Sequence, residues 1–148
     1  MTEPLREPLN ELPADIELAQ AFTAALNAHD VDAVIELFTE EDSGPTITAD
    51  AYAWQKFEIG LWAQQQVQAS IRIDAYDYRL MHQGATWNAD VYRDDWRQHG
   101  VDPLRVTNTI SVRRGRLANF TSTPRNQYDA ESLGRLWRPG VSPEHPPK

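Results

Sequence analysis

The sequence predicts an α+β domain in which three N-terminal helices pack on a bent, four-stranded antiparallel sheet. Three observations carry this prediction. Apolar residues recur at helical spacing in the first half of the chain, they alternate with polar residues in the second half, and short turns separate the alternating segments. A helical half followed by a strand half is typical of folds that place their helices on one face of a sheet.

Length and proline placement predict one domain with two tails. The chain has 148 residues, and its 41% hydrophobic and 24% charged residues exclude disorder of the whole chain. Seven of the ten prolines lie near the ends. Because proline fixes φ and removes a hydrogen-bond donor, residues 1–13 and 139–148 are expected to be flexible tails around a folded body over 14–138.

Composition also narrows the function. Fourteen basic and 22 acidic residues give a net charge of −8, which argues against nucleic acid as a partner. No apolar run approaches the roughly 18 residues of a membrane span, and the N-terminus does not resemble a secretory signal, so we expect a cytoplasmic protein with no membrane partner. The chain has no cysteine, and no histidines or carboxylates show metal-ligand spacing. We therefore expect neither a metal nor another cofactor.

Three helices are expected in the first half. The first runs over 15–27. Asp30 is positioned to cap a second, short helix, and Asp50 to cap a third over 51–66. Their apolar stripes are Ile16, Ala19, Phe22 and Leu26 in the first, Val31, Val34, Ile35 and Phe38 in the second, and Trp54, Phe57, Leu61 and Gln65 in the third.

Four strands are expected over 69–82, 86–96, 104–112 and 116–123. Within the first strand the apolar residues move from odd positions to even ones, which is the pattern that a β-bulge produces. Apolar residues occupy both phases of the first two strands. We therefore expect helices to cover one sheet face and a second subunit to cover the outer face, giving a homodimer.

Three segments resemble a known family. They are Ala25–Phe38, with its helix-break-helix pattern, the turn His99–Leu104, and the strand-turn-strand segment Ile110–Leu117. Together they resemble the nuclear-transport-factor-2-like superfamily, in its SnoaL-like and limonene-epoxide-hydrolase-like branch. The resemblance implies a cone-shaped pocket between a strongly curved sheet and the helices, and frequent dimers. It leaves function open, because this fold hosts hydrolases, isomerases, cyclases, dehydratases and binding modules.

The family's catalytic motifs are incomplete here. Its epoxide hydrolases use an Arg-x-Asp pair on the second long strand and an Asp on the last strand; those positions hold Asn88, Asp90 and Ser122, so only Asp90 matches. Its ketosteroid isomerases use a Tyr and an Asp. The Tyr position holds Phe22, and the Asp position falls near Thr48, or on Asp50 if the loop is longer, although Asp50 is better explained as a helix cap. The resemblance therefore supports neither reaction.

Asp90 and His82 are the candidate catalytic residues. If Asp90 faces the pocket, burial would raise the pKa of its carboxyl group and fit it for proton transfer. If the strand instead turns Trp87, Ala89 and Val91 inward, Asp90 is solvated. His82 lies at a strand end, where it is either a base or a solvated turn residue.

Asn108 is the main candidate for ligand binding. It interrupts the apolar face of the third strand, near the position of an inward Asn in scytalone-dehydratase-like members of the family. A buried amide needs partners, which a ligand, Asp90 or Tyr78 could supply. The other ligand-binding candidates are Tyr78, Asn88, Trp54 and Tyr52. The large aromatics of the chain fit a core and dimer interface or an aromatic pocket.

The leading functional expectation is cofactor-independent acid/base chemistry on a mostly apolar small organic molecule, as a lyase, isomerase, cyclase or hydrolase. Asp90 would move the proton, and Asn108 and a tyrosine would hold the polar atom of the substrate. The alternative is a non-catalytic ligand-binding or dimerisation module. A titratable or hydroxyl partner of Asp90 inside a closed pocket would favour the enzyme.

Overall fold

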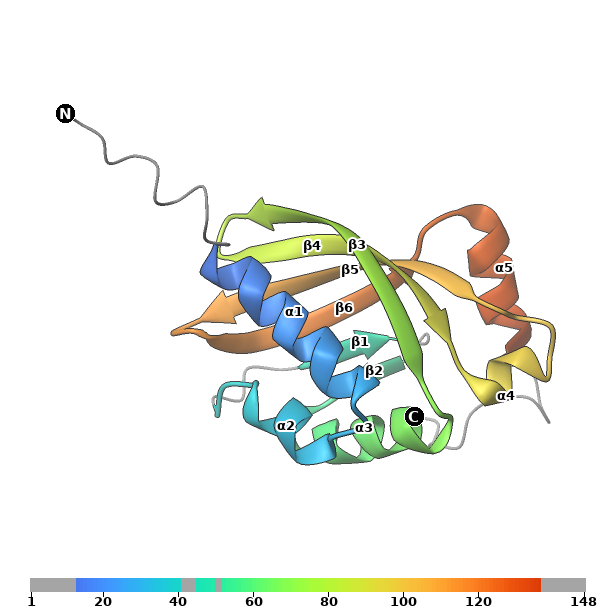
Figure 1. Ribbon diagram of the computed structural model, residues 1–148, viewed down its shortest axis with the longest axis horizontal. Helices are drawn as coiled ribbons and strands as arrows, with labels where there is room; N and C mark the ends of the chain where they lie inside the picture. The colour runs from blue at the N-terminus through green and yellow to red at the C-terminus, as the bar shows by residue number, and fades with distance from the viewer. Residues whose placement is uncertain (1–12, 41–44, 50–51, 137–148) are drawn as a thin grey trace.

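The computed structural model describes residues 13–40, 45–49 and 52–136, and these residues have the expected α+β class (Figure 1). The helical elements are α1 (Ala14–Asn27), α2 (Val31–Glu36), the 3-10 helix η2 (Lys56–Glu58), α3 (Ile59–Gln68), α4 (Asp94–Arg97) and α5 (Gln127–Leu136). The strands are β1 (Ile47–Ala49), β2 (Tyr52–Trp54), β3 (Arg72–Met81), β4 (Gly84–Tyr92), β5 (Leu104–Arg113) and β6 (Arg116–Pro124).

The sheet contains the four expected strands and two more. Its order is β2-β1-β6-β5-β4-β3. The strands β3 to β6 form the antiparallel meander that the alternating pattern predicts. The short strand β1 runs parallel to β6 and antiparallel to β2, so the sheet is mixed. The expected strand count of four is therefore corrected to six.

The third helix was expected to start too early. Residues Tyr52–Trp54 form β2, and α3 begins only at Ile59, after the 3-10 turn. Two short runs of β-branched and aromatic residues lie close enough in sequence to pair as β1 and β2, and this pairing buries Trp54 in the core. The free energy gained by burying Trp54 in the core thus outweighs the preference of the segment for a helix. Asp50, the expected cap, lies outside the described residues.

The second long strand is shorter than expected. It was predicted to continue to Trp96, but β4 ends at Tyr92 and the one-turn helix α4 follows. Asp94 and Asp95 occupy the first turn of α4, where carboxylates are favoured by the helix dipole.

Helix α5 was not expected from the sequence. The side chain of Asn126 accepts a hydrogen bond from the N–H of Asp129 at 3.0 Å and so caps its first turn. The carboxylate of Asp129 is fully buried; it accepts hydrogen bonds from the backbone N–H of Arg105 at 2.9 Å and from Arg105 Nε at 3.2 Å. These bonds fasten α5 to β5, and they bring Leu133 to the end of the sheet.

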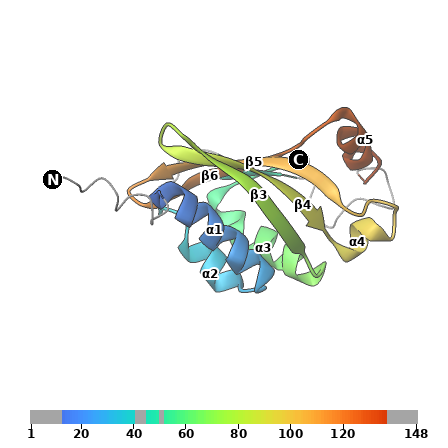
Figure 2. The same cartoon turned by 45° about the horizontal axis from the view of Figure 1, so that its top comes forward.

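Helices α1, α2 and α3 lie on one side of the sheet, while α4 and α5 lie at one of its ends (Figure 2). We call the face toward α1 the inner face and the opposite one the outer face. The inner face forms the core, in which Phe22 of α1 packs its ring 4.7 Å from that of Phe120 and 6.2 Å from that of Trp62. Among the described residues, no helix combines the length and apolar character of a membrane span.

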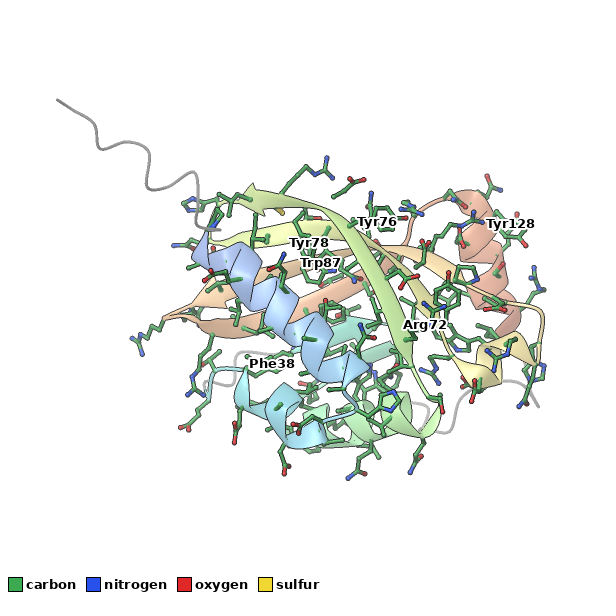
Figure 3. The ribbon with its side chains drawn as sticks, viewed as in Figure 1. Phe38, Arg72, Tyr76, Tyr78, Trp87 and Tyr128 are labelled. Atoms are coloured by element: carbon green, nitrogen blue, oxygen red, sulfur yellow. The ribbon has the colours of Figure 1, made fainter. Side chains whose placement is uncertain are left out.

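The predicted bulge in β3 is confirmed. The pairing of β3 with β4 shifts register between Tyr76 and Arg79, and Asp77 has a φ of 61°. The extra residue changes which side chains face inward. Tyr76 consequently points to the outer face, opposite Asn88, and Tyr78 packs inward with its ring 5.6 Å from that of Trp87 (Figure 3).

Candidate ligand pocket

A pocket lies on the inner face. It is bordered by the sheet and by residues of helices α1, α3, α4 and α5. The space inside it is small, about 30 Å³, which is room for one or two water molecules. Its lining is mostly apolar: Leu26, Ala49, Trp62, Gln66, Ile71, Ile73, Val91, Trp96, Leu104, Val106, Asn108, Phe120, Ser122, Pro124 and Leu133. A larger guest requires these side chains to move apart.

Asn108 is the polar side chain that the sheet turns into this pocket. The alternation of β5 buries Val106, Asn108 and Ile110 together on the inner face. The side-chain oxygen of Asn108, Oδ1, is buried and has no hydrogen-bond partner among the described residues. An unpaired buried amide costs free energy, about 1–3 kcal/mol. Neither Asp90 nor Tyr78, the two neighbours considered from the sequence, bonds to this oxygen; Asp90 bonds to Tyr76 and Arg125 instead, and Tyr78 stacks on Trp87.

A second amide lines the same pocket from α3. Gln66 is buried, its Oε1 accepts a hydrogen bond from Nη1 of Arg93 at 3.0 Å, and its Nε2 has no partner within the described part of the chain. Arg93 lies behind Gln66 and is itself buried; its Nη2 and Nε donate to the carboxylate of Asp95 at 2.6 and 3.0 Å. The pocket therefore borders an ion pair in which the arginine is buried and the carboxylate of Asp95 is 40% exposed.

Two indoles and the hydroxyl of Ser122 are the other polar groups of the described lining. Trp62 and Trp96 both carry a buried Nε1–H for which the described residues provide no acceptor. No carboxyl, imidazole, amino, guanidinium or phenol group belongs to the lining that the structure describes. The described lining can thus donate and accept hydrogen bonds, but it lacks a group suited to proton transfer near neutral pH.

The structure places Asp90 on the outer face. Trp87, Ala89 and Val91 are the buried residues of β4, so the alternation turns Asp90 away from the pocket. Its carboxylate accepts a hydrogen bond from the hydroxyl of Tyr76 at 3.0 Å and forms an ion pair with Arg125 at 3.4 Å, and its side chain is 27% exposed. Arg125 also donates to the Tyr76 hydroxyl at 2.5 Å. Asp90 has a hydroxyl partner, but this pair stands outside the pocket.

The other sequence candidates do not meet at one site. Asn88 is on the outer face, where its Oδ1 accepts from Thr107 Oγ1 at 3.1 Å. His82 is exposed in the turn between β3 and β4. Trp54 and Tyr52 lie in β2 with their rings 4.9 Å apart, and neither belongs to the pocket lining.

Tyr78 lies between the sheet and α1, and it also stays outside the lining. Burial raises the pKa of its phenol group above the ordinary value of 10.0, and a hydrogen bond with Thr23 partly offsets the shift. Its ring stacks on Trp87, so it acts as part of the core near α1.

Sequence reasoning found Asn108, counted Trp62 only among the large aromatics that fit a core or an aromatic pocket, and missed Gln66 and Trp96. A signal for Gln66 existed, because Trp62 and Gln66 are four residues apart and so share a helix face. The pattern assigned that helix a stripe that included Gln65 instead. Trp96 was hidden because it was counted as the end of a strand.

Comparisons with known proteins identify the fold. No protein-family model and no curated protein matches the sequence. Three solved structures of similar fold illustrate the match. An epoxide hydrolase/cyclase-like enzyme with a role in pyran ring formation in the polyether salinomycin is 15% identical, with a TM-score of 0.65, and the match covers 78% of this chain and 92% of that one.

The second is a candidate polyketide cyclase from Sinorhizobium meliloti, 18% identical, with a TM-score of 0.61 and coverage of 76% of this chain and 95% of that one. The third is an NTF2-like protein of unknown function from Cytophaga hutchinsonii, 10% identical, with a TM-score of 0.61 and coverage of 77% and 91%. Identities this low establish architecture alone. The chain therefore has the nuclear-transport-factor-2-like fold that its sequence resembles.

Proposed function

We propose that this protein binds a small, uncharged and mostly apolar organic molecule in the inner-face pocket, with a polar atom of the ligand held by Asn108. The observation that carries the proposal is the unpaired Oδ1 of Asn108, buried between apolar neighbours in that pocket. An unsatisfied buried polar group in a folded protein calls for an explanation, and a ligand or ordered water that completes it is the simplest one. The neutral, apolar lining favours an uncharged guest.

Cyclohexanol is a suitable probe, because it has an apolar body and a hydroxyl group that can donate a hydrogen bond to Oδ1 of Asn108. It is larger than the space in this form, so its binding requires the lining to open. We expect saturable shifts of the indole N–H signals of Trp62 and Trp96 in a ¹H–¹⁵N titration, with each signal assigned by its Trp→Phe variant. Trp87 lies outside the lining, so its signal serves as the internal control. Equal shifts of all three signals, or none up to the solubility limit, would contradict the proposal.

A second candidate is cofactor-independent acid/base chemistry on the same kind of molecule. It is supported by the solved structures of similar fold that are described as a cyclase and as an epoxide hydrolase/cyclase-like enzyme. Asp90 and His82 are the groups proposed to move the proton, and both are placed outside the described pocket lining. We rank binding first for this reason. Turnover of an epoxide or ketone substrate that disappears in Asp90→Asn would reverse the order.

The homodimer also remains a proposal. The outer face is lined by hydroxyl, amide and charged side chains, including Thr107 and Asn88, so a partner there would meet a polar surface. We expect a sedimentation mass near twice the chain mass of 16.9 kDa. Thr107→Arg, which places an unpaired charge on that face, should return the mass to that of one chain. A single-chain mass for the parent would rule the dimer out.

A further inference from the structure

We infer that Arg93, which lies behind the pocket, fixes Gln66 as an obligate hydrogen-bond donor and thereby makes the pocket select ligands that present an acceptor oxygen, such as neutral ketones. This inference rests on the proposed function, because it concerns the ligand of the same pocket. It adds a positioning residue, Arg93, and a chemical class of ligand that the shape of the pocket alone does not provide.

The two ends of the Gln66 amide differ in their hydrogen-bonding character. One end of the amide accepts hydrogen bonds and the other end donates them, while a guanidinium group only donates. Nη1 of Arg93 bonds to Oε1 of Gln66 at 3.0 Å. Turning the amide over would set donors against donors in a buried place, so this orientation is strongly favoured. Nε2, the donating end, is therefore the end left without a partner among the described residues.

Contacts with Asp95 and Trp96 fix the side chain of Arg93. Its side chain is 2% exposed, and its Nη2 and Nε bond to the carboxylate of Asp95. Its guanidinium also lies 4.6 Å from the ring centre of Trp96, a cation–π contact. Because these contacts fix Arg93 before any ligand arrives, the orientation of Gln66 is set in advance.

The pocket lining contains more unpaired hydrogen-bond donors than unpaired acceptors. Gln66, Trp62 and Trp96 each offer an unpaired N–H, and an indole nitrogen can only donate. Oδ1 of Asn108 and the hydroxyl of Ser122 are the acceptors of the same lining. A ketone oxygen can only accept from the N–H groups, whereas an alcohol can also donate its hydrogen to Asn108 or Ser122. The arrangement therefore selects a ligand that presents an acceptor oxygen to Gln66, and a ketone depends on the Gln66 donor more strongly than an alcohol does.

Three probes of nearly equal size test this: cyclohexanone, cyclohexanol and cyclohexane. The ketone-to-alcohol affinity ratio of the parent protein is the reference. The substitution Gln66→Glu keeps an oxygen toward Arg93 and replaces the Nε2 donor by an acceptor. The ratio should then fall at least about tenfold, because the ketone loses a donor and the alcohol gains an acceptor. An unchanged ratio in Gln66→Glu would overturn the inference.

The role of Arg93 has its own test. In Arg93→Met the amide of Gln66 is free to turn. The ketone-to-alcohol affinity ratio should therefore fall and the side-chain NH₂ signals of Gln66 should shift, while the affinity for cyclohexane stays the same. Arg93→Lys keeps a donating cation and should restore the parent ratio. Arg97→Met, at an exposed arginine of α4 that pairs with Asp94, is the matched control and should leave the ratio unchanged.

Failures of the two proposals are distinguishable. If none of the three probes shifts the indole signals of the parent, both the proposed function and this inference are wrong. If the probes bind the parent pocket but the ratio is the same in the parent and in every variant, only this inference is wrong. If Arg93→Met does not fold, the ratio in Gln66→Glu decides the matter.

Discussion

The two faces of the sheet differ in whether their polar side chains are hydrogen-bonded. On the outer face, the amide of Asn88 is bonded to Thr107, and the carboxylate of Asp90 is bonded to Tyr76 and Arg125. On the inner face, the amide oxygen of Asn108 is more deeply buried and has no partner in the described chain. The comparison teaches that the presence of a polar residue is a weaker sign of a binding site than an unmet hydrogen bond.

The largest effect is expected from removing a buried carboxylate whose bonds are complete. Asp129→Ala leaves the N–H of Arg105 without its acceptor and releases α5 from β5, so it should lower the free energy of unfolding by about 3 kcal/mol. Urea denaturation measures this change. Asp74→Ala, at an exposed pair with Arg72, is the control and should change little. Equal losses of unfolding free energy in the two variants would contradict the stabilising role of the buried Asp129 carboxylate.

The next effect has the opposite sign. Asn108→Leu removes an amide whose oxygen is unsatisfied and should raise the free energy of unfolding by about 1 to 2 kcal/mol. It should also weaken the binding of cyclohexanol, which loses its acceptor at Asn108. The same change on the outer face, Asn88→Leu, removes a made hydrogen bond and should lower stability by about 0.5 to 1 kcal/mol. If both leucine variants change stability in the same direction, the contrast between the faces fails.

Asp90→Asn should have a smaller, destabilising effect. In a pocket, neutralising the carboxylate would stabilise the protein. On the outer face the change weakens the ion pair with Arg125 and the bond from Tyr76, at a cost of about 0.5 to 1 kcal/mol. Melting temperatures at neutral pH, in low and high salt, measure it. A variant more stable than the parent would place Asp90 in an environment different from the one described.

The smallest effect concerns Tyr78 and alkaline pH. Its phenol has a raised pKa in the folded protein because it is buried, so the unfolded chain ionises first as pH rises through about 10. Stability should therefore fall between that pH and the higher pKa of the folded state. Tyr78→Phe should lessen the loss between about pH 8 and pH 10.5. Tyr128→Phe, at a mostly exposed ring, should leave the loss unchanged.

The class of the fold was predictable because residues that are buried on the inner face recur at regular spacing along the helices and strands. The alternation in β5 and the phase slip in β3 are visible as apolar residues, and the structure confirms both the meander and the bulge. Two of the segments that failed are short: β2 has three residues and α4 has four, too few for a period to distinguish helix from strand. Helix α5 has ten residues, but few of them are apolar, so few positions indicate a helical period in the sequence.

The site was only partly predictable. Asn108 could be found because a polar residue in an apolar stripe is anomalous by itself. The position of Asp90 depended on which phase of β4 is buried, and both phases contain apolar or aromatic residues. Gln66 could not be recognised, because its relevance arises from contact with Arg93, 27 residues away in sequence. Contacts between distant segments leave no local pattern.

The bulge at Asp77 has a consequence for the free edge of the sheet. Strand β3 is the last strand in the order, and its far end exposes Leu80 and Met81, an apolar edge of the kind that recruits other chains. The irregularity between Tyr76 and Arg79 interrupts the row of backbone groups that an incoming strand would need for continuous pairing. The same residue that sorts two tyrosines onto opposite faces thus also makes this edge a poorer template for an incoming strand.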